Sequence, residues 1–255
     1  MSDHLPLLPG AEPFSHRGGR IGALILHGFT GSPQGLRPQA EAFAAAGYTV
    51  EMPLLPGHGT TVEDMAKYGW ADWTKAVDAA YRDLAARCDS VVVLGLSMGG
   101  ALTLWLAWEH PEIAGIVLVN PFVEPDDFTE MARTATDLLA EGSEFLPGVG
   151  NDIADPEATE LAYTSTPVRC LLSLIGGMRA HKKRLPGTLV PTLLLHSVQD
   201  HIIPPGSSAL LTERLGGPVE LVELTRGFHV ATIDLDKQEI NERALEFAAR
   251  RTSGN

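Results

Sequence analysis

The sequence predicts an α/β fold in which a mostly parallel central sheet is flanked by helices. Short apolar runs alternate along the chain with longer stretches of helical periodicity, the pattern of a parallel sheet covered by helices. The chain has 255 residues, of which 44% are hydrophobic and 20% charged. This composition supplies enough apolar side chain for one sizeable core.

The N-terminal half is expected to hold four buried strands, at residues 21–26, 48–52, 90–96 and 115–119. Three helices are expected between them, at residues 37–46, 70–87 and 98–109. Gly47 follows the first helix and Pro111 the third, and both residue types commonly end helices. The segment PLLPGHGTT, at residues 53–61, is rich in turn formers and is expected to be a loop.

The pattern changes between residues 120 and 185, where no run is a convincing strand. Acidic residues gather in its first part and basic residues in its later part. We expect a small, mainly helical insertion at 120–185 in a core formed by 1–119 and 186–255. The α/β alternation then returns, with strands expected at 192–197 and 219–224 and helices at 205–215 and 238–251.

The excess of acidic over basic residues indicates which partners the protein is expected to have. The formal net charge of -13 argues against a nucleic-acid partner and against docking on anionic lipid. Residues 1–14 lack the basic start and long apolar core of a signal peptide. Residues 90–108 are uncharged and long enough to span a bilayer, but their central glycines favour strand, turn and helix. We therefore expect a cytoplasmic protein without stable membrane insertion, as a monomer or weak homodimer.

The histidines and cysteines suggest no metal site. Cys88 and Cys170 belong to no C-x-x-C pair and are expected to be free thiols. No H-E-x-x-H spacing occurs, and no G-x-G-x-x-G or phosphate loop follows the first expected strand. We expect no metal and no cofactor.

The pentapeptide Gly95-Leu96-Ser97-Met98-Gly99 points to a nucleophilic serine. G-x-S-x-G between a strand and a helix forms a tight turn that lifts the serine Oγ above the sheet edge. The bare pattern occurs by chance, but here a β-branched run precedes it and a helical run follows. Ser97 is therefore the candidate nucleophile.

A serine nucleophile needs a base and an acid that orients the base. After a G-x-S-x-G serine, the acid and then the histidine are expected further along the chain. Asp200 follows the strand expected at 192–197, and His229 follows the strand expected at 219–224. Glu124 or Asp126, after the strand at 115–119, is the alternative acid.

The other histidines fit the role of base less well. His201 is adjacent to Asp200 and too close in sequence to be its partner from a separate loop. His196 falls inside an expected strand. The remaining candidates look like surface or helix-end residues: His4, His16, His110 and His181.

A developing oxyanion needs preorganised N–H donors. The amide after the nucleophile, that of Met98, is one expected donor. The second is the amide of Phe29, in the HGFTGSP loop that follows the first expected strand. His27 and His58 are expected to brace loops rather than to react.

Several segments together carry a resemblance to a known family. LILHGFTGSP, PLLPGHGT, GLSMGG and HVATIDLD resemble the bacterial monoacylglycerol lipases and related carboxylesterases of the α/β-hydrolase fold. The resemblance runs from GAEPF near the N-terminus to the final helix and is weakest at 120–185.

This resemblance implies a cap, formed by 120–185, that shapes an acyl pocket. It implies hydrolysis of medium- to long-chain monoacylglycerols or simple esters without a cofactor. Glu160, in DPEATELAY, matches a glutamate that contacts the glycerol head group, and Val149, in PGVGND, matches an apolar residue beside it. The alternatives are a short- to medium-chain carboxylesterase or acyl-thioesterase, a lyase or haloperoxidase of the same fold, and a non-catalytic binding protein on this scaffold.

Overall fold

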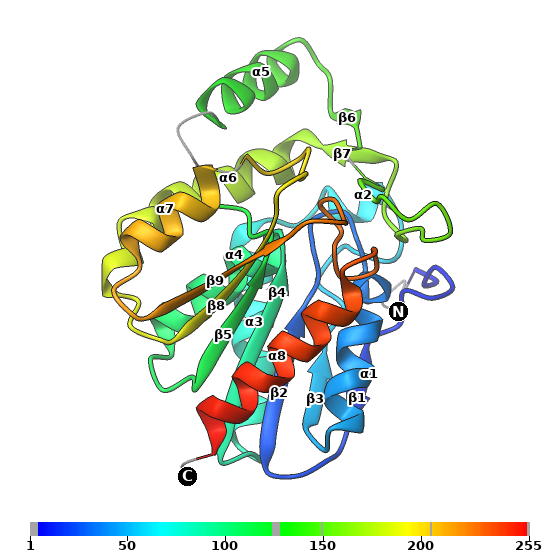
Figure 1. Ribbon diagram of the computed structural model, residues 1–255. Coiled ribbons are helices and arrows are strands. Elements are labelled where there is room, and N and C mark those ends of the chain that lie inside the picture. Colours follow the sequence, from blue (N-terminus) through cyan, green and yellow to red (C-terminus); the bar gives the residue numbers. More distant parts are fainter. Residues whose placement is uncertain (1–4, 124–127, 149, 205, 254–255) are drawn as a thin grey trace.

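The computed structural model contains a seven-stranded sheet with helices on both faces (Figure 1). It describes residues 5–123, 128–148, 150–204 and 206–253. The strand order is β1-β3-β2-β4-β5-β8-β9. Strand β1 is antiparallel to β3, and every other neighbouring pair in this sheet is parallel. The expected fold class is confirmed.

The strands of the main sheet are β1 Phe14–His16, β2 Ile21–Leu26, β3 Thr49–Met52, β4 Ser90–Leu96, β5 Gly115–Val119, β8 Thr192–Ser197 and β9 Val219–Leu224. The α-helices are α1 Arg37–Ala45, α2 Val62–Met65, α3 Trp70–Ala85, α4 Met98–Glu109, α5 Phe128–Ala140, α6 Val168–Lys182, α7 Gly206–Arg214 and α8 Lys237–Thr252. Two short 3-10 helices, Pro33–Leu36 and Leu185–Gly187, complete the chain together with the ribbon β6 Phe145–Pro147 and β7 Ser165–Pro167.

Each strand and helix expected from the sequence has a counterpart whose ends differ by at most two residues. The expectation that residues 120–185 contain no strand is wrong, because β6 and β7 pair there as an antiparallel ribbon. Each of these strands is three residues long, too short to reveal a period of two. The edge strand β1 and helix α2 were also not expected, because three and four residues are too few to show a hydrophobic period.

Both faces of the sheet are buried, and the central strands supply side chains to each. On β4, Val91 and Val93 pack in the cluster that contains residues of α3, α4 and α6. Val92 and Leu94 point the other way, into the cluster built on α1 and α8. A strand covered on both sides has no polar face, which explains its uninterrupted apolar run.

The segment between β5 and β8 divides into two parts. Helix α5 lies farthest from the sheet, above α6 (Figure 1). Residues 150–163 instead contact the core directly. The Tyr163 N–H donates to the Thr30 carbonyl at 3.0 Å, and the Tyr163 hydroxyl donates to the Gly57 carbonyl at 2.9 Å. Gln34 pairs with the same segment through the Leu161 N–H at 2.9 Å.

The uncharged stretch that is long enough to span a bilayer does not form one helix in the structure. Across the described residues, the structure has no helix of sufficient length and apolarity to cross a membrane. The uncharged stretch at 90–108 is divided between β4 and α4, with a turn at Ser97.

The packing at Gly99 gives a first test of the fold. A Cβ added there would lie 2.0 Å from the Leu26 carbonyl oxygen, so Gly99→Ala must displace backbone. We expect a loss of about 2 kcal/mol or more in the free energy of unfolding, measured by urea denaturation. Gly176→Ala in α6 is the control, because an added Cβ meets nothing within 4 Å. It should stabilise the helix by about 0.5–1 kcal/mol, and equal stabilities of the two variants would contradict the packing.

Candidate active site

Ser97 occupies a strained turn between β4 and α4. Its φ of 54° and ψ of -116° are uncommon for a residue with a side chain. A Cβ on Gly95 would lie 2.2 Å from the Gly99 carbonyl oxygen, and one on Gly99 would meet the Leu26 carbonyl. The two glycines therefore let strand and helix meet closely enough to form the turn. Such strain at one residue supports a functional role for Ser97.

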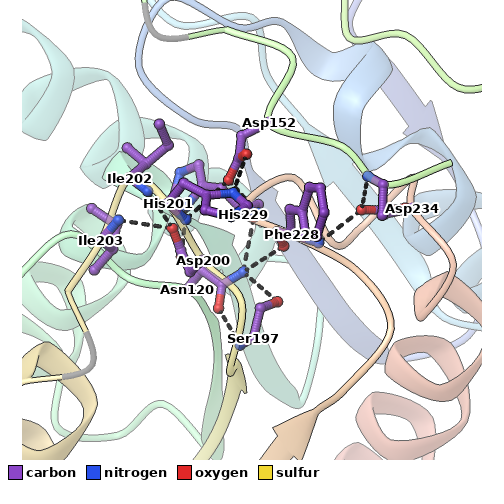
Figure 2. A network of polar contacts seen from close by, with 11 residues as sticks. Asn120, Asp152, Ser197, Asp200, His201, Ile202, Ile203, Phe228, His229 and Asp234 are labelled. Atoms are coloured by element: carbon purple, nitrogen blue, oxygen red, sulfur yellow. Dashed lines mark hydrogen bonds and ion pairs between the residues drawn. The ribbon is translucent and has the colours of Figure 1, made fainter. Parts of the chain in front are cut away.

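Asp200 and His229 come together from two loops at the carboxyl ends of β8 and β9 (Figure 2). His229 Nδ1 lies 2.8 Å from Asp200 Oδ2. The other oxygen, Oδ1, accepts the N–H groups of Ile202 and Ile203, each at 2.8 Å. The Asp200 side chain is 1% exposed, so its carboxylate is fixed and shielded. A carboxylate in this position selects the His229 tautomer that carries its proton on Nδ1.

Ser97 and His229 line one pocket, together with Gly28 and Phe29. A Cβ added to Gly28 would lie 3.5 Å from Ser97 Cβ, so the loop after β2 runs against the serine. Within the described residues, the amides of Phe29 and Met98 have no hydrogen-bond partner. This geometry brings the five expected residues to one site, and their catalytic roles stay predictions.

Four candidates from the sequence lie outside the described residues: His4, Glu124, Asp126 and Val149. Of the rival histidines, His201 pairs with Asp152 rather than with Asp200. His196 lies within β8, as expected. His110 bridges Asp78 and Glu112 at the end of α4, away from the pocket. The expectation that His181 lies at the surface is wrong, because this side chain is buried on α6.

His27 and His58 brace the loop that carries the Phe29 amide. His27 Nε2 accepts the Leu55 N–H at 3.1 Å, which places its proton on Nδ1, 3.0 Å from the Gly28 carbonyl oxygen. His58 lies edge-on to His27 with ring centroids 4.9 Å apart. Burial lowers the pKa of His27 to about 3, with the charge of His58 adding to the effect, and lowers that of His58 to about 4. These contacts support the expectation that both histidines brace loops.

Asn120 is a site residue that the sequence reasoning missed. It follows β5 with a φ of 42°. Its Nδ2 donates to Ser197 Oγ at 2.9 Å and to the His229 carbonyl at 2.8 Å, while its Oδ1 accepts the Ser197 N–H at 2.8 Å. The amide thus ties the end of β5 to the loops of both Asp200 and His229. A polar residue directly after the apolar run GIVLV was the available signal.

Asp234 is a second missed residue, and it anchors the histidine loop to the insertion. Its side chain accepts the N–H groups of Ala154, Asp155, Phe228 and Leu235 at 2.7–2.9 Å. Burial opposes the ionised form, but these four donors outweigh it and hold the pKa of Asp234 below its ordinary value. Nothing in HVATIDLD indicated that this aspartate points inward.

Glu160 lines the mainly apolar pocket at Ser97. A Cβ added to Gly31 would lie 2.6 Å from Glu160 Oε1, so the carboxyl lies over the loop that carries Phe29. Burial raises the pKa of Glu160 to about 7, against the opposing effect of His229. The apolar side chains that line this pocket include Phe29, Leu96, Met131, Leu146, Leu171, Leu174, Ile202 and Val230.

Comparisons with known proteins agree with this geometry. The model of a family described as serine aminopeptidase, S33, matches residues 22–236. A thermostable monoacylglycerol lipase from Bacillus sp. strain H-257 is 43% identical over 251 residues, covering 98% of this chain and 99% of the relative. A carboxylesterase from Bacillus subtilis strain 168 is 26% identical and covers 92% and 95% of the two chains.

A solved structure from work on the metagenome-derived lipolytic enzymes LipS and LipT superposes with a TM-score of 0.90. It is 44% identical and covers 96% of this chain and 100% of the other. The whole chain, including residues 120–185, is therefore similar to lipolytic enzymes.

The buried histidines predict acid sensitivity of the fold. In the unfolded chain a histidine titrates near pH 6.5, whereas His27 and His58 resist protonation when folded. Between these values the unfolded state binds the extra protons, so stability falls as the pH is lowered, by about 1.4 kcal/mol per pH unit for each histidine.

His58→Gln should make the decline in stability between about pH 5.5 and 4.5 shallower by up to about 1.4 kcal/mol per pH unit. Urea denaturation at a series of pH values measures it. His16→Gln, at an exposed histidine, is the matched control and should leave the slope as in the unmodified protein. An identical slope in all three proteins would contradict a buried, neutral His58.

Proposed function

Since this chain belongs to the serine aminopeptidase S33 family of hydrolases, we propose that it hydrolyses monoacylglycerols through Ser97, His229 and Asp200. It is a carboxylic ester hydrolase with the α/β-hydrolase fold. The observation that carries the finer proposal is the pocket at Ser97. Its lining is mainly apolar, and among the described residues that line it Glu160 alone carries a carboxyl group. This lining matches a substrate with an acyl chain and a polar head.

The proposed reaction has two acyl-transfer steps. Ser97 Oγ attacks the ester carbonyl while His229 Nε2 takes the hydroxyl proton, and Asp200 holds the imidazole through Nδ1. The N–H groups of Phe29 and Met98 donate to the oxyanion that forms. His229 then returns the proton to the departing glycerol oxygen. Water deprotonated by His229 attacks the acyl-enzyme and releases the fatty acid. The steps use only side chains and amides of this chain, so the proposal includes no cofactor or metal.

The substrate is proposed to lie with its acyl chain along the apolar wall and its glycerol beside Glu160. Residues from the insertion, such as Met131, Leu146 and Leu171, supply part of that wall, which supports the proposal that 120–185 is a cap. Val149 is proposed to contact the head group as well. A glycerol hydroxyl can donate to the Glu160 carboxylate, whereas an alkyl ester has no donor to offer.

Two further proposals concern the setting of this reaction. We propose a cytoplasmic enzyme that acts as a monomer or weak homodimer. The similarity to a carboxylesterase supports a second candidate, a general short- to medium-chain carboxylesterase. The acidic charge and the site geometry offer no support for a nucleic-acid partner.

Ser97→Ala tests the proposed nucleophile. Removing Oγ leaves binding and the oxyanion donors intact, so kcat on a monoacylglycerol should fall by roughly 10⁴-fold or more. A fluorophosphonate should label the unmodified protein at Ser97, located by peptide mass mapping, and leave the variant unlabelled. Ester hydrolysis retained in Ser97→Ala would exclude the acyl-enzyme mechanism.

Glu160→Gln tests head-group recognition. The amide keeps the size of the side chain but removes its charge, so kcat/KM for a monoacylglycerol should fall about 10-fold, the value of one charge-assisted hydrogen bond. Hydrolysis of the ethyl ester of the same fatty acid should change little.

Glu157→Gln is the matched control, because Glu157 lies in the same segment with an exposed side chain, and both activities should persist. If Glu160→Gln lowers both esters equally, or if the unmodified enzyme does not prefer the monoacylglycerol, the carboxylesterase candidate is favoured.

A further inference from the structure

A second carboxylate, that of Asp152, contacts the loops of Asp200 and His229 but takes no part in the reaction outlined above (Figure 2). Asp152 belongs to the segment 150–163, and its side chain is 13% exposed. Its Oδ2 accepts the N–H of His229 at 3.1 Å and the N–H of His201 at 3.2 Å. Its Oδ1 lies 2.7 Å from His201 Nδ1.

These contacts connect two loops that are far apart in sequence. His201 directly follows Asp200, and the Asp152 main-chain carbonyl accepts the N–H of Val230, directly after His229, at 3.1 Å. Asp152 therefore holds the backbone beside the acid and the backbone on both sides of the base. The His229 side chain meets Asp200 at the centre of this arrangement.

We propose that Asp152 is a positioning residue for His229, fixing the distance between the acid loop and the histidine loop. The proposal rests on the function proposed for the same site. A misplacement of about 1 Å in a catalytic group can cost roughly 100-fold in rate, so a contact that sets this distance acts on kcat. Glu160 lies in the same segment, its N–H held by Asn151 Oδ1 at 2.7 Å. Head-group recognition and the geometry of His229 thus depend on one stretch of chain.

The contacts favour positioning over a purely structural role. The His201 side chain is 60% exposed, and ion pairs at exposed positions add little to stability. The bond to the His229 N–H, in contrast, bears on the residue proposed to transfer the proton. Asp234 anchors the same loop independently at Phe228, so the loop can stay folded after Asp152 is changed while His229 loses its alignment.

Asp152→Ala is the direct test, with kcat and KM measured on a monoacylglycerol and on the ethyl ester of the same acid. We expect kcat to fall about 10-fold or more on both substrates with KM changed less than about 2-fold. Asp152→Asn keeps an oxygen that can accept the His229 N–H, so it should recover most of the lost kcat. Asp155→Ala is the matched control from the same segment, because the Asp155 carboxylate contacts the Glu157 N–H and Lys237 Nζ rather than the His201 or His229 N–H.

Proton NMR gives a readout that does not depend on turnover. The proton shared by His229 Nδ1 and Asp200 Oδ2 should give a downfield signal in the unmodified protein. It should shift or broaden in Asp152→Ala and remain in Asp155→Ala. An unchanged signal together with an unchanged kcat in folded Asp152→Ala would overturn the positioning role.

His201→Ala tests the connection that Asp152 makes between the acid loop and the histidine loop, if Asp152→Ala does not fold. It removes the imidazole at an exposed position and with it the contact between His201 Nδ1 and Asp152 Oδ1. We therefore expect kcat to fall about 3-fold or more with KM unchanged. If this variant equals the unmodified enzyme in kcat and in the shared-proton signal, the positioning role of Asp152 is overturned. The proposed function fails separately, if the unmodified protein does not hydrolyse the esters or if Ser97→Ala still does.

Discussion

Parallel pairing of β2, β4, β5, β8 and β9 brings the carboxyl ends of these strands to one edge of the sheet, and each site element leaves the sheet there. The chain after β2 supplies the Phe29 amide, and the chain after β4 supplies Ser97. Asp200 follows β8 and His229 follows β9. Both faces of the sheet are covered by helices, so the central strands are buried on both sides. Residues that are remote in sequence therefore meet at a defined separation.

The described loops beyond that edge are not paired as strands, and polar side chains hold them in place instead. The carboxylates of Asp152, Asp200 and Asp234 all accept backbone N–H groups, and the amide of Asn120 accepts one as well as donating to carbonyls. A carboxylate bonded in this way orients several amides at once. Irregular backbone can then hold a catalytic geometry as firmly as regular structure does.

Burial shifts the pKa of three ionisable side chains at this edge of the sheet. Burial lowers the pKa of His27 and His58 and keeps both neutral near the loop that carries Phe29, so they place no positive charge beside the Phe29 amide. The Glu160 carboxyl lies where burial disfavours its charge and raises its pKa. Apolar side chains around the Glu160 carboxyl lower the local dielectric, which strengthens polar contacts within the pocket.

The sequence by itself determined the order of strands and helices, because hydrophobic periodicity and the glycines and prolines at their ends are local signals. It also determined the candidates Ser97, Asp200 and His229, because each follows a recognisable strand and the chemistry requires those residue types. Tertiary structure alone decided the partners of Asn120, Asp152 and Asp234. Their contacts join segments separated by up to 109 residues, and no local pattern encodes which backbone amide a buried carboxylate will meet. The short strands β6 and β7 belong to this second group, since three residues acquire strand geometry only from the neighbour with which they pair.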